Sequence, residues 1–412
     1  MSVERPRTVW ILGAGFSQPL GGPLFGTLLA PGTEANIRTT FSRKDFPAVF
    51  GDAARAVVAL YNYGIRFRHG MPFQWTPPLA VPGEDLWEDA EEFLSYLDSP
   101  PDGGKRLLEL IPVLIDVPGG FKLDALNLLA RRMIAAQCSA FLRNAAIGSE
   151  RWAAHLQFAR FVVDDQLGEH RLLTFNYDTA VERAFLEHAK QATLATGKPQ
   201  PTRLHVEGPD RFVNLAEKNH GGSSPLYKLH GSTNWYLDPQ KTWVADSNEY
   251  ACLNCEGEIL LGTPGLNKAQ VIAKLNPLWS KAIDELTQAD IIVFVGYRFP
   301  KTDATARQKI LGAIRDNRSN YLRVHTVLGP DLSSTNAVRL RGLLTHALAN
   351  RTQLPGVTFA DSGSEQNRLR MYNPGPAGRL WFRHQEHPMW AEDFLSLVPG
   401  TLPFVRPEVG QP

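Results

Sequence analysis

The chain has few cysteines, almost no net charge and no long apolar run. Its 412 residues include three cysteines, too few for a disulfide framework. The formal net charge is +1, from 43 basic and 42 acidic residues, so no bulk field recruits nucleic acid or an anionic membrane. No run approaches the roughly 18 apolar residues of a membrane span, and no apolar signal core precedes the first predicted strand. We therefore expect a reduced, cytoplasmic protein without a membrane or direct nucleic-acid partner.

Short apolar segments alternate with helical ones along the chain. Hydrophobic residues make up 43% of it, enough for one elaborated domain or two to three smaller ones. The predicted strands end in glycine or a polar group, and they cover residues 8–12, 171–175, 225–229, 290–295 and 322–328, the last being the expected final strand. This alternation predicts an α/β fold, with a Rossmann-like open, mostly parallel sheet and a large helical insertion. Ligands of such sheets bind beyond the carboxyl ends of the strands.

The pattern divides the chain into a core and two additions. Residues 1–33 and 165–330 are predicted to form the discontinuous core. Residues 34–164 are predicted to form a loop and a helical insertion, and residues 331–412 a C-terminal helix and tail that pack on the core. Within the insertion, the aromatic and Pro/Gly-rich residues 61–83 indicate an irregular loop, which either covers a site or is a surface excursion.

Helical spacing is clear in several segments. Phe93, Leu94 and Leu97 share one face of a predicted helix that begins near Glu84, and this face either contacts a partner or packs on the sheet. Further helices are expected over residues 121–146, 152–163 and 336–350. Residues 179–182 have the spacing of a capping box at the start of another helix.

The stretch from Arg7 to Phe25 turns from an apolar run directly into glycines. Residues 8–12 are typical of a buried parallel strand, and Gly13-Ala14-Gly15 follows without a spacer. Since glycine lacks a Cβ, this backbone can turn tightly and bring N–H groups near a phosphate, with a following helix N-terminus favouring the anion. The full dinucleotide fingerprint is absent, because Gln18 stands where a third glycine is due. The segment fits either a nucleotide cradle or an ordinary strand-to-helix turn.

Polar groups fall at three predicted strand ends, which are residues 13–17, Asn176 with Asp178, and His230 with Gly231. The imidazole suits a general base near neutral pH, because its reference pKa is about 6.5. Asparagine both donates and accepts hydrogen bonds, so it can orient a hydroxyl or a water. Each group alone also fits a structural role, as a core histidine or a turn cap. Together they predict one pocket.

These segments resemble the motifs of sirtuins. GAGFSQPLGGPLF is similar to the sirtuin NAD-binding segment GAGxSxxxGxPxF, and TFNYD at residues 174–178 is similar to the TQNID motif. His230-Gly231 in KLHGS matches the catalytic His-Gly of the family, and Gly296 in VFVGYRF stands at the position of a GTS-type turn. The matches follow the order of the family from Arg7 to about Leu328, without the helical insertion or the tail.

The resemblance implies a dinucleotide site and a catalytic pair. His230 would be the base, Asn176 would orient the water or a ribose hydroxyl, and Asp178 would hold the loop or the nicotinamide ribose. Two positions depart from the family, since Phe175 replaces a Gln and Gly26 stands where an Arg is usual. The other cofactor-binding residues that it implies are Gly13, Ala14, Gly15, Phe16, Ser17, Pro23, Gly231 and Gly296.

The cysteines depart from the zinc module of sirtuin deacylases, which has two Cys pairs. Cys252 and Cys255 form the only Cys-x-x-Cys pair, and Cys138 lies far upstream in a predicted helix, where a core position is the simplest interpretation. A structural zinc site needs about four ligands. We therefore expect no metal, with Cys252 and Cys255 in a tight turn as free thiols.

The pattern is closest to the bacterial sirtuin-like NADases of anti-phage defence. That resemblance implies an enzyme that hydrolyses its substrate NAD to nicotinamide and ADP-ribose. Two alternatives stay open: a sirtuin-type protein deacylase or ADP-ribosyltransferase, and a non-catalytic nucleotide-binding assembly subunit. Because a constitutive NADase would deplete its own cell, we expect control by homo-oligomerisation or by a separately encoded partner, such as a HerA-type ATPase.

Overall fold

The structure is a computed structural model of the 412-residue chain. The residues that it describes are 5–24, 27–30, 32–42, 51–68, 87, 89–98, 108–109, 111–112, 120–145, 149–165, 168–214, 224–248, 251–253, 258–262, 266–300, 303–319, 321–349, 358–360, 370–373 and 381–401.

The core of the molecule is an open sheet whose strands run in the order β11-β12-β13-β10-β9-β1-β2-β5-β3. The seven strands from β13 to β3 pair in parallel, and β11 and β12 add an antiparallel edge. The predicted fold class, a Rossmann-like and mostly parallel sheet, is therefore confirmed. The bounds are β1 (Arg7–Leu12), β2 (Glu169–Thr174), β3 (Leu204–Glu207), β5 (Ser224–Lys228), β9 (Ile291–Val295), β10 (Tyr321–Val327), β11 (Thr358–Ala360), β12 (Arg370–Asn373) and β13 (Trp381–His387).

The chain reverses direction across the sheet at β1. From β1 it proceeds to β2, then to β3 at the edge and back to β5 between them, and it then crosses to β9, β10 and β13 on the other side. Ligands of open α/β sheets bind at such a switch point, beyond the carboxyl ends of the strands. β1 and β9 are apolar almost throughout because both faces of these central strands are covered.

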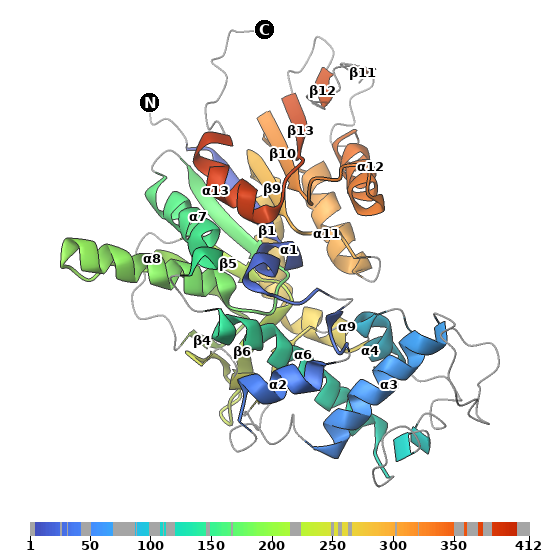
Figure 1. The fold of residues 1–412 in the computed structure, drawn as a ribbon. Helices are drawn as coiled ribbons and strands as arrows, with labels where there is room; N and C mark the ends of the chain where they lie inside the picture. The colour runs from blue at the N-terminus through green and yellow to red at the C-terminus, as the bar shows by residue number, and fades with distance from the viewer. Residues whose placement is uncertain are drawn as a thin grey trace.

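Helices cover both faces of the sheet. Figure 1 shows α7 (Ala153–Asp164) and α13 (Ala391–Thr401) on one side, where α8 (Ala180–Thr196) packs beside α7. On the other side, α11 (Ala304–Arg315) packs between α10 (Asn276–Thr287) and α12 (Thr335–Ala349). None of the helices that the structure describes combines the length and the apolar character needed to cross a membrane.

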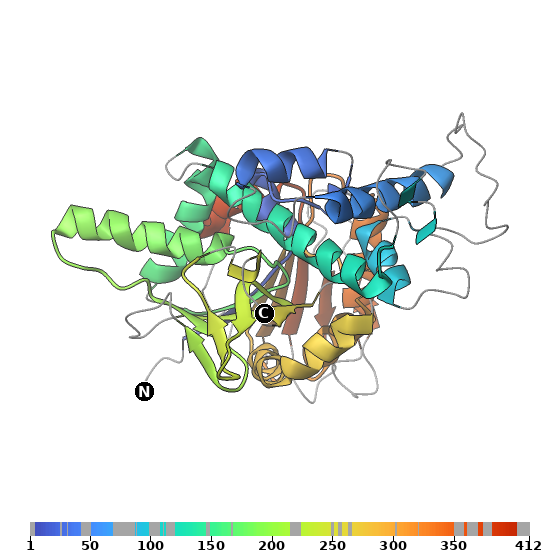
Figure 2. The same cartoon turned by 90° about the horizontal axis from the view of Figure 1, so that it is seen from below.

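The helical insertion has a hydrophobic core of its own. It is built from α2 (Thr33–Thr40), α3 (Asp52–Arg68), α4 (Ala90–Asp98) and α6 (Leu123–Asn144), which lie below the sheet in Figure 1 and cross in front of it in Figure 2. Phe93, Leu94 and Leu97 are buried in this core. Our expectation that they contact a partner or pack on the sheet is therefore wrong, because α3 and α6 cover them.

The aromatic segment that we expected to be a loop is partly helical. Tyr61 to Arg68 form the last two turns of α3, and the remainder, from residue 69 to residue 83, lies outside the described residues. Gly64 lies within this helical part, and a Cβ there would lie 2.3 Å from the indole of Trp87. The glycine is needed for this close approach and does not break the helix. The α4 helix also begins at Ala90, later than predicted.

β4, which precedes β5, and three strands that follow β5 form a smaller sheet. Its order is β4-β7-β6-β8, with β4 (Phe212–Asn214), β6 (Gly231–Leu237), β7 (Trp243–Ala245) and β8 (Ile259–Leu261). Short 3-10 turns are η1 (Gln18–Leu20), η4 (Glu150–Trp152) and η5 (Ala251–Leu253), and α9 (Leu266–Lys274) leads back to the core.

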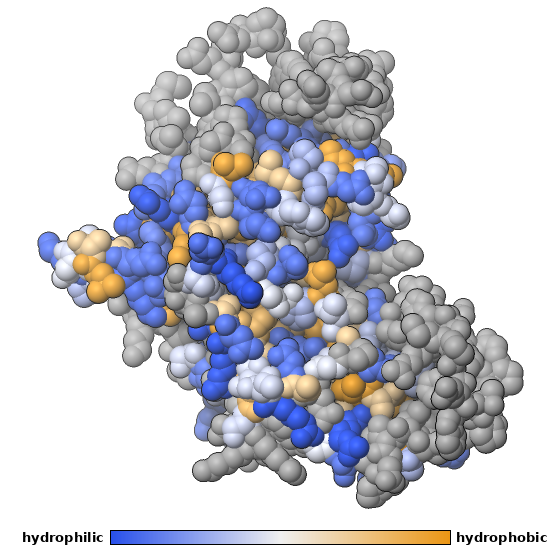
Figure 3. Space-filling view, viewed as in Figure 1, coloured by the Kyte–Doolittle hydropathy of each residue, from blue (hydrophilic) through white to orange (hydrophobic). Residues whose placement is uncertain are grey.

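The C-terminal segment contributes to the main sheet. We expected β10 to be the last strand, and this is wrong, because β13 follows it in the chain and pairs with it in parallel over seven residues. Phe394 and Leu395 of α13 then enter the main core. The proposed division at residues 33, 164 and 330 stays a prediction. Along the face shown in Figure 3, α8 projects from the body with Leu186 and Leu194 among its exposed residues.

Candidate functional site

Backbone hydrogen bonds bring the ends of β1, β9 and β10 together. The N–H of Gly13 donates to the carbonyl of Val295 at 3.0 Å, and the N–H of Gly15 donates to that of Gly296 at 3.2 Å. The N–H of Gly296 in turn donates to the carbonyl of Val327 at 2.9 Å. The glycine segment thus lies at the switch point of the sheet.

The two glycines at this point pack directly on each other. A Cβ at Gly15 would lie 2.6 Å from Cα of Gly296, and one at Gly296 would lie 2.4 Å from Cα of Gly15. From the sequence we expected that Gly15 lacks a side chain so that a phosphate can approach the backbone. The structure adds a second reason, because the backbone of Gly296 lies directly against Gly15. The expected helix after it, α1 (Ala14–Ser17), is a single turn that continues into η1.

Asn176 is tied to the glycine segment. Its Nδ2 donates to the carbonyl of Gly13 at 2.9 Å and to Oγ of Ser17 at 3.0 Å. Its backbone N–H is bonded to Oγ1 of Thr174, the last residue of β2. Both side-chain bonds use the amide nitrogen, which leaves the Oδ1 acceptor for another group. The structure therefore joins two of the three strand ends that the sequence singled out.

Asp178 begins α8. Its Oδ1 accepts the N–H of Ala180 at 3.0 Å, whereas Thr179 makes no side-chain cap. The predicted capping box is therefore wrong, because Asp178 provides the cap and Glu182 pairs with Lys228. Burial raises the pKa of Asp178 from 3.8 to about 6, although the Lys228 ammonium and the bonds from Ala180 and the Ser17 hydroxyl act in the opposite direction.

Lys228 links two of the motifs. Its side chain is fully buried at the end of β5, and its Nζ donates to the carbonyl of Asp178 at 2.5 Å and to Oε1 of Glu182 at 2.8 Å. His230 follows two residues later. Sequence reasoning missed Lys228, because one lysine after an apolar run gives no sign that it is buried.

His230 lies beside a second residue that the sequence did not reveal. Its Nε2 is 3.3 Å from Oδ2 of Asp303, and both side chains are buried. Tyr297 donates its phenolic hydrogen to the same carboxyl oxygen at 3.2 Å. Asp303 follows β9 and precedes α11, so it reaches His230 from the far side of the switch point. The only available signal was its place after a strand end.

Phe175 connects these groups through its ring. It stacks on Tyr297 with a centroid distance of 4.0 Å and meets the imidazole of His230 edge-on at 4.9 Å. The sirtuin motif has a polar Gln here. The substitution gives one flank of His230 an apolar, aromatic surface.

The family model of the SIR2-like domain matches residues 170–354, which include Asn176, His230 and Asp303 and exclude the glycine segment. Residues 170–354, somewhat less than half of the chain, are thus similar to a SIR2-like domain. A solved sirtuin structure, described as "The Structural basis of Sirtuin Substrate Affinity", aligns at 14% identity and a TM-score of 0.31, over 83% of this chain and 95% of that one. No curated protein matches.

A SIR2-like domain indicates an NAD-utilising, sirtuin-like protein. The anti-phage subtype, like the role of each predicted residue, stays a prediction. Among these residues, Phe16 is held by His155 of α7, whose Nε2 donates to the Phe16 carbonyl at 2.7 Å. Pro23 is partly exposed beyond Gly22, whose N–H donates to the Ser17 carbonyl. Ala14 is the first residue of α1 and stands between Gly13 and Gly15.

Gly231 of the SIR2-like domain occupies a position that only glycine can hold. Its φ is +78°, and a Cβ there would lie 1.9 Å from the carbonyl oxygen of Leu260. This contact places the start of β6 directly against β8, immediately after His230. The His-Gly pair therefore couples the predicted base to the smaller sheet.

The cysteines give no metal site in the part of the chain that the structure describes. There, no three or more His, Cys, Asp or Glu side chains are grouped to hold an ion. Cys138 is a buried core residue of α6, as expected. Cys255 and the side chain of Cys252 lie outside the described residues, so their state stays a prediction.

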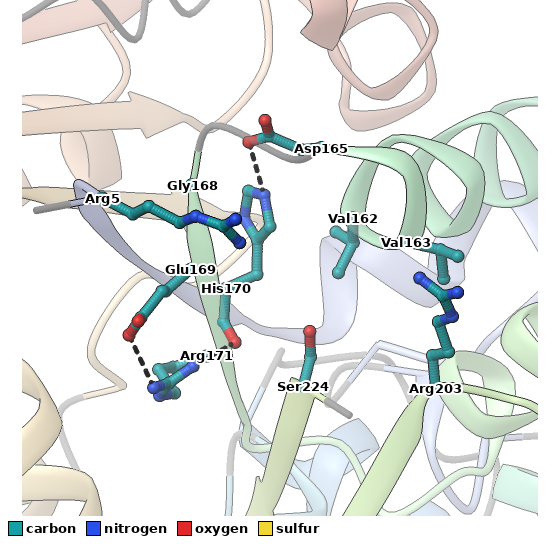
Figure 4. Close-up of a pocket in the computed structure, with 10 residues that line it drawn as sticks. All are labelled: Arg5, Val162, Val163, Asp165, Gly168, Glu169, His170, Arg171, Arg203 and Ser224. Carbon is teal, nitrogen blue, oxygen red and sulfur yellow. Dashed lines mark hydrogen bonds and ion pairs between the residues drawn. The ribbon is translucent and has the colours of Figure 1, made fainter. Parts of the chain in front are cut away.

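A cavity of about 310 Å³ lies at the opposite, amino-terminal edge of the sheet (Figure 4). His170 in its wall accepts a hydrogen bond from the Trp10 indole at 3.1 Å and donates one to Asp165 at 2.9 Å. Arg171 is bonded to Glu169 at 2.9 Å. Because these polar groups form hydrogen bonds with one another, we assign them a structural role, which is to hold the first residues of the strands together.

The buried carboxyl of Asp178 predicts a pH-dependent stability. Its pKa is higher in the folded chain than in the unfolded one, so the folded state holds the proton more tightly, and the free energy of unfolding falls as pH rises from about 4 to about 6. The shift corresponds to about 3 kcal/mol. Asp178→Asn cannot ionise, so we expect its stability relative to the wild type to rise across this window. Urea unfolding of the wild type and of Asp178→Asn at about pH 4.5 and pH 7 measures this change. If the difference between their free energies of unfolding is the same at both pH values, the raised pKa of Asp178 is contradicted.

Proposed function

We propose that the chain hydrolyses NAD to nicotinamide and ADP-ribose. The observation that carries this proposal is the gathering of Gly13, Asn176 and His230 at one edge of the sheet, within or beside a SIR2-like domain. The NAD pyrophosphate would lie along the glycine segment. The nicotinamide ribose would lie between Asn176 and His230.

The reaction breaks the bond between C1′ of the ribose and the nicotinamide nitrogen. The bonding pair leaves with nicotinamide, and the ribose acquires oxocarbenium character, as in glycoside cleavage. The oxygen of a water molecule then bonds to C1′, and one proton is released. Oδ1 of Asn176 would accept a hydrogen bond from this water or from a ribose hydroxyl. His230 would take up the proton, and the Asp303 carboxylate 3.3 Å away would stabilise the resulting imidazolium.

The surroundings of His230 support hydrolysis over transfer to a large acceptor. Phe175 and Tyr297 form a stacked pair beside the imidazole, and all three side chains are buried. A water can enter such a confined space more easily than an acyl-lysine chain.

The deciding experiment measures the products that the purified chain forms from NAD. We expect equal amounts of nicotinamide and ADP-ribose by liquid chromatography, without any added acceptor. An acetyl-lysine peptide supplied in parallel should not change the rate. Nicotinamide release that appears only with the peptide would instead favour the deacylase, and NAD binding without any product would favour the assembly subunit.

We also predict that activity depends on assembly. Leu194 near the end of the projecting helix α8 is 84% exposed, and we propose it as one residue of a contact between subunits. Light scattering over a dilution series, with NAD turnover measured at each concentration, checks the prediction. We expect specific activity to fall as the homo-oligomer dissociates, whereas a fully active monomer would contradict it. A HerA-type ATPase is a separate candidate regulator for the same assay.

A further inference from the structure

Three arginines gather beyond the carboxyl ends of β9 and β10. Arg298 lies in the loop after β9, Arg307 in the first turn of α11, and Arg339 near the start of α12. The two helices pack on each other on one side of the sheet, as Figure 1 shows. Nη2 of Arg339 donates to the carbonyl of Arg298 at 2.8 Å and to that of Phe299. The start of α12 therefore lies against the loop after β9.

The positive charges of these three side chains act on one another. Burial and the charges of Arg307 and Arg298 lower the pKa of Arg339. Within the described part of the chain, none of the three guanidinium groups forms an ion pair. Arg341, further along the same helix, differs, because its Nε lies 2.6 Å from Oε2 of Glu386. Like charges held together in partly buried positions repel one another, and a bound anion relieves this repulsion.

Two acidic side chains in the adjoining loops are engaged elsewhere. The carboxylate of Asp303 is buried beside His230. Oδ1 of Asp331 accepts bonds from the backbone N–H and the hydroxyl of Ser333, at 2.9 and 2.5 Å. Arg298 is exposed, so an anion can approach the cluster from solution. The arginines therefore offer an uncompensated positive site at the carboxyl edge of the sheet.

The order of the strands relates this site to the parts of a bound dinucleotide. Neighbouring strands run in the order β10-β9-β1-β2-β5. In the proposed function, the nicotinamide ribose lies at the ends of β2 and β5, with Asn176 and His230, and the pyrophosphate lies at the end of β1, with Gly13. A dinucleotide that continues in the same direction places its adenosine half over the ends of β9 and β10. Because neighbouring strands are about 4.8 Å apart, these ends lie roughly 5–10 Å from that of β1.

We propose that the three arginines bind the 2′-phosphate of NADP, so that the chain binds this phosphorylated dinucleotide more tightly than NAD. This assignment rests on the proposed function, because the position of the nicotinamide end fixes that of the adenosine end. In dinucleotide-binding sheets, a carboxylate is the usual partner of a free 2′-hydroxyl, and an arginine accommodates a 2′-phosphate. A guanidinium also matches two phosphate oxygens with parallel hydrogen bonds. Arg298 and Arg307 make these bonds, and Arg339 holds the loop and adds its charge.

Binding of ADP-ribose and of 2′-phospho-ADP-ribose to the full chain, measured by isothermal titration calorimetry, tests the proposal. The two ligands differ only in the 2′-phosphate, and neither has a nicotinamide bond to cleave. We expect the phosphorylated ligand to bind about tenfold more tightly or better. Arg298→Gln and Arg307→Gln each remove one charge from a side chain that makes no hydrogen bond or ion pair among the described residues. Each should weaken binding of the phosphorylated ligand by about tenfold and leave that of ADP-ribose unchanged.

The matched control is Arg315→Gln. Arg315 lies at the other end of α11, where it pairs with Asp316 at 2.8 Å, and its loss should leave the binding of both ligands unchanged. Equal affinity of the wild type for the two ligands would overturn the proposal. A preference that survives in both Arg298→Gln and Arg307→Gln would overturn it as well, because the phosphate would then bind elsewhere.

Nicotinamide release from NAD and from NADP, measured in parallel, separates this proposal from the proposed function. If neither dinucleotide is cleaved but the arginine-dependent preference is found, the hydrolase is refuted and the phosphate site stands. If both are cleaved and the wild type binds the two ADP-ribose ligands equally, the hydrolase stands and the phosphate site is refuted.

Discussion

His230→Ala and Asn176→Ala should each lower NAD cleavage by about 100-fold or more, because general-base and positioning roles are each typically worth that much. The two losses have different causes. Removing the imidazole takes away the proton acceptor beside Asp303. Removing the Asn176 side chain takes away the acceptor at C1′ and also both bonds that fix Gly13 and Ser17 relative to β2.

The kinetic parameters separate these causes. We expect His230→Ala to lower kcat with little change in KM, and Asn176→Ala to raise KM as well, because the glycine segment loses its tie. His205→Ala is a matched control. His205 also faces a carboxylate, that of Glu207 at 3.6 Å, but it lies on β3, the outermost strand on one side of the sheet. Each variant needs an unchanged melting temperature. Near-normal turnover in a well-folded variant would refute the role of that residue.

The strand ends that carry the site could be predicted from local pattern. An apolar run followed by glycine or a polar residue marks the end of a parallel strand, and this signal placed Gly13, Asn176 and His230 correctly at one edge of the sheet. Parallel topology alone then brings them together. The roles of these residues were inferred from the sirtuin motifs, and neither the fold nor the family match tests them.

The partners of these residues could not be predicted in the same way. Asp303 reaches His230, and Tyr297 reaches Asp303, only because β9 pairs with β1 although the two strands are far apart in sequence. Nothing near Asp303 in sequence signals its burial. The pairing of Lys228 with Glu182 likewise depends on how α8 packs beside β5. The position of β13 next to β10 could not be predicted either, because local composition was misleading there. Its polar composition, WFRHQEH, resembles an exposed segment more than a strand of a parallel sheet.

Glycine was the least reliable local signal. Gly64 belongs to the Pro/Gly-rich segment that we predicted to be a loop, but it lies within α3, where it makes room for Trp87. Gly15 indicated a phosphate cradle, and its closest neighbour proves to be Gly296. A glycine can be required by a turn, by a ligand or by another segment of the chain, and the sequence does not distinguish these reasons.

Gly296→Ala should therefore destabilise the fold itself, by about 3 kcal/mol or more, because two costs coincide. Its φ of +64° is unfavourable for any residue with a Cβ, and the added methyl would lie within 2.4–2.7 Å of three backbone atoms of Gly15. Backbone atoms at the junction of β1 and β9 cannot move aside without breaking two hydrogen bonds, from Gly13 to the carbonyl of Val295 and from Gly15 to that of Gly296. Gly15→Val, which a phosphate cradle alone predicts to lose only NAD affinity, should lose stability for the same reason.

Gly312→Ala provides the matched control. Gly312 lies within α11, and no described atom outside its own helix backbone lies within 4 Å of the position that an added methyl would take. Alanine there should therefore stabilise the chain by up to about 1 kcal/mol through helix propensity. Thermal and urea unfolding of the three variants beside the wild type measure the effect. If Gly296→Ala unfolds like Gly312→Ala, the contact between the two glycines is not tight. If Gly15→Val keeps full stability but loses NAD binding, the glycine segment serves the phosphate alone.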